Sequence, residues 1–227
     1  MFGYDWNLSL LWEYRAAFWN GLLVTFLLTG SSIVGGMLVG CPLGVILATT
    51  SSTLKPVRAL IYIFCAIFGW LPVLVLLIWM YYVIPLAFGL RPSALSVSIV
   101  ALALNLSAFI ADIVRAAIMR VSTDDIDAAK AVGMSFGVRL QRIVLPEVVR
   151  NSLPALVALY INQFKWTTVA SVIGVQELLH VADTVMIQTY RSIEAYTAIA
   201  LIYLVAVGLM NTAYVTLQRH PFFVPRG

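Results

Sequence analysis

The chain has 227 residues, of which 62% are hydrophobic and only 11% are charged, and its mean hydropathy is +0.96. This composition excludes an ordinary soluble domain, which needs more polar surface to face water, and a disordered chain, which contains few apolar residues. The remaining class is an all-α integral membrane protein, because helices satisfy their own backbone hydrogen bonds in lipid.

The apolar residues form five segments, each long enough to cross a bilayer as a helix. A transmembrane β-barrel is disfavoured, since runs such as 71–77 do not alternate between apolar and polar residues. A polar segment at 120–151, called the two-helix loop below, separates the third span from the fourth. We therefore predict one membrane domain with spans at about 19–50, 60–88, 93–119, 153–175 and 196–217.

The first two spans carry residues that affect helix packing. In the second span, Pro72 predicts a bend that faces the substrate pathway. In the first span, small side chains recur every four residues and predict a close approach to another helix, either within this chain or in a partner chain. This small-residue stripe consists of Ser32, Gly36, Gly40, Gly44 and Ala48.

Polar residues lie at membrane depth in the third and fourth spans. A charged Lys165 in the fourth span costs roughly 2.5–3.5 kcal/mol on insertion scales, so it is expected to face protein or water. It either lines the substrate pathway or is a structural lysine, hydrogen-bonded to a neighbouring helix or reaching to an interface. Asp112 and Arg115, three residues apart in the third span, predict a local ion pair. The uncharged polar residues either line a substrate pathway or make hydrogen bonds between helices. They are Asn105, Asn162, Gln163, Thr167 and Thr168.

The distribution of cations predicts the orientation in the membrane. Arg15, Arg91 and Arg191 lie on one side, beside several acids. By the positive-inside rule the richer side is cytoplasmic, which places the N-terminus outside, and the C-terminus and the two-helix loop inside. The net charge of +4 therefore reflects topology, and no nucleic-acid partner is indicated. The cations of the richer side are Lys55, Arg58, Arg120, Lys130, Arg139, Arg142, Arg150, Arg219 and Arg226.

The two-helix loop contains signals for two short helices outside the membrane. A first helix is predicted to start near Asp127, whose carboxylate suits a helix N-terminus, and to end at Gly133, which tolerates a left-handed conformation. Ser135 is expected to cap a second helix that runs to about Val144, where Pro146 stops it.

The spacing within this loop resembles the EAA loop of ABC importer permeases. The resemblance implies that residues 127–133 insert into a groove on a cytoplasmic ATPase, while the last three positions of the motif anchor the loop at the membrane. The one departure is an aspartate where the family usually has glutamate, and the charge is kept. The matching positions are Asp127, Ala128, Ala129, Gly133, Ile143, Leu145 and Pro146.

Further segments, at 20–25, 104–109 and 172–178, are similar to the polar amino-acid uptake branch of these permeases. That resemblance implies a bacterial inner-membrane protein that pairs with a second permease subunit, as a homodimer or heterodimer. It also implies two cytoplasmic ATPase subunits and an extracytoplasmic solute-binding protein. The imported solute would be a polar amino acid or a related amphoteric compound.

Two segments depart from the usual pattern of that branch. At 68–72 the chain reads Phe-Gly-Trp-Leu-Pro, where the branch usually reads Phe-Arg-Gly-Thr-Pro. At 165–168 it reads Lys-Trp-Thr-Thr, where the branch usually reads Lys-Asp-Thr-Ser. An arginine and an acid are therefore missing at membrane depth, which bears on the solute that is carried.

No catalytic motif is present in the sequence. It contains neither a Walker-type phosphate loop nor a zinc-ligand spacing, so ATP and Mg²⁺ are expected to bind to a separate ATPase chain, and no cofactor or metal is expected here. One rival interpretation is an ion-coupled carrier acting without an ATPase, although no internal repeat supports it. A membrane scaffold or sensor subunit is a second rival, which predicts no substrate flux.

Overall fold

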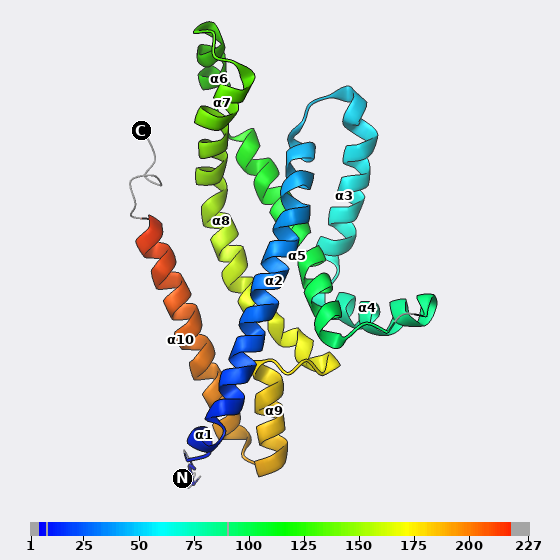
Figure 1. Cartoon of the computed structure of the whole chain (residues 1–227), viewed down its shortest axis with the longest axis vertical. Helices are drawn as coiled ribbons and strands as arrows, with labels where there is room; N and C mark the ends of the chain where they lie inside the picture. The colour runs from blue at the N-terminus through cyan, green and yellow to red at the C-terminus, as the bar shows by residue number, and fades with distance from the viewer. Residues whose placement is uncertain (1–4, 8, 90, 219–227) are drawn as a thin grey trace.

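The computed structural model describes residues 5–7, 9–89 and 91–218, and this part of the chain is helical without strands (Figure 1). Five of its helical segments are long and apolar enough to span a membrane, which confirms the predicted fold class. These candidate spans are Arg15–Ala48, Ser52–Trp70, Ala94–Met119, Phe136–Ile173 and Ser192–Thr216. The elements are α1 (Ser9–Glu13), α2 (Arg15–Ala48), η1 (Ser52–Leu54), α3 (Lys55–Trp70), α4 (Val73–Phe88), α5 (Ala94–Met119), α6 (Thr123–Ala131), α7 (Phe136–Arg139), η2 (Leu140–Val144), α8 (Leu145–Trp166), η3 (Thr167–Ile173), α9 (Leu178–Thr189) and α10 (Ser192–Gln218).

The centre of the bundle is the pair α2 and α5, which cross in close contact (Figure 1). A Cβ atom added at Gly40 would lie 2.6 Å from the carbonyl oxygen of Ser107, and one at Gly44 would lie 2.6 Å from that of Ala111. Only glycine allows two backbones to approach so closely. The predicted close approach is therefore confirmed, and it takes place within this chain.

The second predicted span is divided into two helices. α3 ends at Trp70, Leu71 is extended with ψ 132°, and α4 starts only after Pro72. Because the ring of a proline disfavours the helical conformation of the residue before it, Leu71 leaves the helix and the chain changes direction. The prediction of one continuous span at 60–88 was wrong, since α4 lies across the direction of the long helices (Figure 1).

The two ends of the bundle differ in the elements that they hold. α6, α7 and the connection between α2 and α3 lie at one end, and α1 and α9 lie at the other (Figure 1). Lys55 and Arg58 therefore share an end with the two-helix loop, as the cation pattern predicts. Arg219 and Arg226 lie outside the described residues. Which end faces the cytoplasm stays a prediction.

Candidate functional site

The first helix of the two-helix loop, α6, begins at Thr123 after the N-cap Ser122, four residues before the predicted start near Asp127. The Ser122 side chain accepts a hydrogen bond from the backbone N–H of Asp125 at 3.4 Å, and Asp124 and Asp125 occupy the first turn. Lys130 lies in the last turn and pairs with Asp127 at 2.6 Å. These charges suit the helix dipole, so α6 is stabilised by its own sequence in a segment with little other packing.

Gly133 ends α6 through a Schellman motif. The backbone N–H of Gly133 donates to the carbonyl of Lys130 at 2.9 Å, and that of Met134 donates to the carbonyl of Ala129 at 3.0 Å. Gly133 has a φ of +77°, a conformation that residues with a side chain rarely adopt. Space is not the reason for glycine here, because a Cβ would meet nothing within 4 Å. The predicted role of Gly133 as a left-handed helix end is confirmed.

The second helix of the loop does not stop at Pro146. It begins after Ser135, which adopts an extended N-cap conformation without a side-chain bond, and it continues through α7 and η2 into α8. η2 is a π-helical turn, in which the N–H of Leu145 bonds to the carbonyl of Leu140. We attribute the continuity of the helix to this wider turn. It accommodates the ring of Pro146, which in an α-helix would clash with the carbonyl four residues earlier.

The tip of the loop exposes apolar side chains. Val132 is 76% exposed and Phe136 is 73% exposed, on the two sides of Gly133. Such residues at the tip of a polar segment indicate a surface that another protein covers. The sequence analysis missed these two residues, although their hydrophobicity within a polar segment is a readable signal.

The seven positions of the loop motif do not share one face. Asp127, Ala128 and Gly133 are exposed, Ala129 is buried, and Leu145 is 54% exposed. The two remaining positions, Ile143 and Pro146, are half-buried. The exposed positions of α6 are therefore available to a partner, whereas Ala129 packs within the loop.

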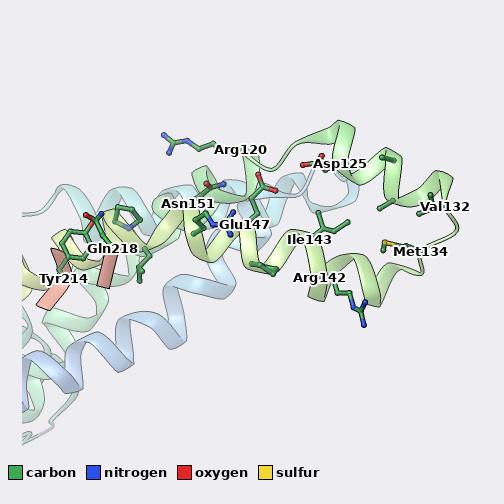
Figure 2. A pocket seen from close by; sticks show the side chains of 16 residues that line it. Arg120, Asp125, Val132, Met134, Arg142, Ile143, Glu147, Asn151, Tyr214 and Gln218 are labelled. Atoms are coloured by element: carbon green, nitrogen blue, oxygen red, sulfur yellow. The ribbon is translucent and has the colours of Figure 1, made fainter. Parts of the chain in front are cut away.

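A hollow of about 1360 Å³ lies between α6, the start of α8 and the end of α10. Figure 2 shows Val132 and Met134 at the tip of the loop, and Tyr214 and Gln218 at the opposite end of the hollow. Ala128, Ala129, Ile143 and Pro146 also line it, so four motif positions border one space. The hollow leaves α6 supported mainly along its own hairpin.

Three of the polar residues at membrane depth point into the subunit. The amide of Asn105 donates to the carbonyl of Phe68 at 2.6 Å, and the amide of Gln163 donates to the hydroxyl of Ser32 at 2.9 Å. Thr167 is fully buried and donates to the carbonyl of Phe164 at 2.8 Å. The bonds of Asn105 and Gln163 join α5 to α3 and α8 to α2, so these two residues serve helix packing.

Lys165 and Asn162 lie instead on an exposed face of α8. The face continues along the helix with two alanines, Ala155 and Ala158, at helical spacing. Lipid is a poor environment for a lysine and an asparagine at this depth, so this face is expected to contact water, substrate or protein. Of the other predicted pathway residues, Thr168 is half-buried with its hydroxyl bonded to the carbonyl of Lys165 at 2.9 Å, and Pro72 is exposed at the start of α4.

The predicted ion pair on α5 is present. Asp112 lies 3.9 Å from the Arg115 side chain, with the aspartate side chain 61% exposed. One helical turn away along α5, the Phe109 ring approaches the Trp166 ring at 6.2 Å between centroids. This aromatic pair joins α5 to α8 next to the exposed Lys165.

Glu177 is a buried acid whose environment the sequence did not reveal. It caps α9, accepting from the backbone N–H of His180 at 2.8 Å, and the Tyr203 hydroxyl donates to it at 3.4 Å. Burial is the main cause that raises the pKa of Glu177 from 4.5 to about 7. At the next residue, the N–H of Leu178 donates to the Thr25 hydroxyl at 3.2 Å, which ties α9 to α2.

Comparisons with known proteins agree with this geometry. Residues 40–221 match the family described as binding-protein-dependent transport system inner membrane component. A protein of Vibrio harveyi, the probable amino-acid ABC transporter permease protein PatM, is 32% identical over 171 residues, 74% of this chain and 77% of the relative. The glutamine transport system permease protein GlnP of Escherichia coli (strain K12) is 26% identical, covering 95% of this chain and 97% of the relative.

Solved structures share the arrangement of helices. One chain in the crystal structure of an amino acid ABC transporter with histidines matches with a TM-score of 0.86 and 29% identity, covering 95% of this chain and 99% of that chain. The MetNI methionine ABC transporter in an inward-facing conformation matches with a TM-score of 0.76 at 21% identity, over 91% of this chain and 97% of that chain, which shows the fold alone. Since the family match spans most of the sequence, the chain belongs to the inner membrane components of binding-protein-dependent transport systems.

Proposed function

We propose that this chain is the permease subunit of an ATP-driven ABC importer that carries a polar amino acid or a related amphoteric solute across the bacterial inner membrane. The observation that carries the proposal is the two-helix loop, which projects from the bundle and exposes apolar residues at its tip. Relatives named as amino-acid and glutamine permeases support the class of solute. An ion-coupled carrier is not favoured, because the relative at 32% identity and the similar structure at 29% identity both belong to amino-acid ABC transporters.

The loop is the element that receives force from the ATPase. In this proposal, Asp127, Ala128 and Gly133 contact a groove on the cytoplasmic ATPase together with the exposed Val132 and Phe136. Ala129 holds α6 against the returning helix. The last motif positions, Ile143, Leu145 and Pro146, anchor the loop where α8 begins.

The continuity of the returning helix supports a mechanical role for the loop. α7, η2 and α8 follow one another without a break, so a displacement of the loop is transmitted directly along α8. α8 carries Lys165 and Asn162 on its exposed face. Closure of the ATPase pair would thus move the pathway face between outward-facing and inward-facing states, which requires two packed arrangements biased by nucleotide.

Three kinds of partner complete the importer. Two ATPase subunits bind ATP and Mg²⁺ on the cytoplasmic side, where the two-helix loop lies. A second permease subunit faces the exposed side of α8 across the pathway. An extracytoplasmic solute-binding protein delivers the solute at the opposite end of the bundle, where α1 and α9 lie.

The pathway residues divide between direct and indirect roles. We assign direct contact with the passing solute or with water to Lys165 and Asn162, which are exposed, and place Thr168 and Pro72 at the border of the pathway. A lysine can pair with the carboxylate of an amphoteric solute. Gln163, Thr167 and Asn105 act indirectly, by holding α8 and α5 in place.

The experiment that tests this function compares Gly133→Leu with Gly137→Leu in the complete importer, reconstituted in proteoliposomes with its ATPase and binding protein. Gly133 has a φ of +77°, whereas Gly137 is a helical residue, and a Cβ at either would meet nothing within 4 Å. The two variants therefore add the same bulk to one loop, and only one disturbs the left-handed turn.

We expect Gly133→Leu to reduce amino-acid import about tenfold or more per ATP hydrolysed, because the strained turn displaces α6 from the ATPase. Gly137→Leu is expected to keep most of the import. The amount of each variant in the membrane should equal that of the wild type. Normal import by Gly133→Leu, or import by the wild-type chain in the absence of the ATPase, would contradict the proposed function.

A further inference from the structure

A second hollow lies at the opposite end of the bundle from the two-helix loop. It is a groove of about 360 Å³ between the start of α2 and the first half of α10, and Leu11 of α1 borders it. Among the described residues that line it, Arg15 is the one with a charge, and it occupies the first position of α2. The other side chains that line it are Leu11, Phe18, Trp19, Leu22, Ala198, Leu201 and Ile202.

The groove runs from the membrane surface into the apolar region. Arg15 and Leu22 are seven positions apart on α2, which places them about 10 Å apart along the helix axis. Trp12 is 72% exposed and Trp19 is 61% exposed, and exposed tryptophans gather where the lipid headgroups begin. The cation therefore lies at headgroup level, and the apolar walls lie at the level of acyl chains.

Arg15 is held at one end of the groove by Trp12, three residues earlier in the chain. Its Nη1 donates to the carbonyl of Trp12 at 2.7 Å, and its guanidinium carbon lies 4.5 Å from the centroid of the Trp12 ring. A guanidinium has five N–H donors, and this bond uses one of them. The stacking fixes the side chain while it leaves donors for an anion, and a phosphate is the anion found at this depth of a bilayer.

We propose that this groove binds one glycerophospholipid, with its phosphate on Arg15 and one acyl chain between α2 and α10. The apolar walls offer water almost no hydrogen-bond partner, so an acyl chain occupies the groove more favourably than water does. The single cation at the headgroup end and the apolar walls below it match the two halves of a phospholipid. The inference is independent of the proposed transport function, since it needs only a bundle embedded in a bilayer.

The test measures how strongly the purified full-length chain holds two lipids with identical acyl chains, by native mass spectrometry from detergent. The probes are dioleoyl phosphatidylglycerol and a dioleoyl galactolipid, which lacks phosphate. The variants are Arg15→Gln and, as a matched control, Arg91→Gln, which removes an exposed arginine outside the groove. Leu201→Trp fills the groove from a side chain that is 53% exposed, so it should not disturb folding.

We expect the wild type to retain one phosphatidylglycerol about tenfold more strongly than the galactolipid, as a charge-assisted hydrogen bond allows. Arg15→Gln should abolish this preference, and Arg91→Gln should keep it. Leu201→Trp should weaken the retention of both lipids. Equal retention of the two lipids by the wild type would overturn the proposal, and so would equal effects of the two arginine variants. A disulfide between two copies carrying Leu201→Cys would also overturn it, since protein would then cover the groove.

Discussion

Glycine is required for different physical reasons in two regions of this protein. In the seam between α2 and α5, Gly40 and Gly44 have ordinary helical backbones, but a Cβ would collide with carbonyl oxygens of α5 at 2.6 Å. In the two-helix loop, Gly133 has open space around it, but its φ of +77° excludes most side chains. The seam needs glycine for contact, whereas the loop needs it for conformation.

This difference separates the rigid part of the molecule from the part that can be displaced. The α2–α5 seam is tightly packed, and tightly packed helices shift little because every displacement meets a neighbour. The two-helix loop is held by its caps, its own hairpin and its continuity with α8. Substitutions in the seam should therefore act on stability, and substitutions in the loop on coupling.

The largest expected effect is that of Gly40→Val, which would force α2 and α5 apart. We expect a loss of about 4 kcal/mol of stability or failure to accumulate in the membrane, since the clash is with backbone. Gly30→Val is the control in the same helix, because a Cβ at Gly30 meets nothing within 4 Å. Thermal unfolding in detergent measures the stability of both variants. Equal melting temperatures of Gly40→Val and Gly30→Val would contradict the role given to the seam.

The pH dependence of stability tests whether Glu177 belongs to the rigid region. Its pKa is raised to about 7 in the folded state, so between about pH 4.5 and 7 the native chain keeps a proton that the unfolded chain has lost. The contribution of Glu177 to stability should therefore be largest below pH 4.5 and fall by up to about 3 kcal/mol as the pH rises to 7.

Glu177→Gln supplies the comparison for this pH dependence. The variant should lack this part of the slope, so the difference in stability from the wild type should change across the pH 4.5–7 window and stay constant above it. Melting temperatures in detergent at several pH values measure the difference. Parallel profiles of the two proteins would show that the carboxyl group is not desolvated.

A smaller effect distinguishes two asparagines at membrane depth. Asn105→Ala removes the bond to the Phe68 carbonyl and should cost about 1–2 kcal/mol, because that carbonyl is left without its partner. Asn162→Ala, on the exposed face of α8, should change stability by less than about 0.5 kcal/mol and act on import instead. The same unfolding assay and an uptake assay separate the two, and a reversed order would refute the assigned pathway face.

Hydropathy predicted the helical class, but it did not predict where the chain turns. Residues 60–88 are apolar throughout, so nothing in their composition distinguishes one long span from α3 followed by α4. The signal was local, in the restriction that Pro72 places on Leu71. Pro146 shows the reverse case, because a π-helical turn keeps a helix continuous where proline alone predicts an end.

The loop and the pathway were predictable to different degrees. Gly133 was identified correctly, because a left-handed helix end leaves a direct mark on the sequence. The pathway residues lie next to one another in sequence but face opposite ways, with Gln163 buried and Asn162 exposed. Which face of α8 is turned outward depends on its contacts with α2 and α5, and one sequence does not state them.

The central claim is that the tip of the two-helix loop lies in the cytoplasm and docks on the ATPase. It is tested most directly by a cysteine at Val132, 76% exposed, in a chain where Cys41 and Cys65 are replaced by alanine. A membrane-impermeant thiol reagent should label it in inside-out vesicles but not in intact cells, and the bound ATPase should protect it. Labelling of intact cells, or labelling unaffected by the ATPase, would contradict this account.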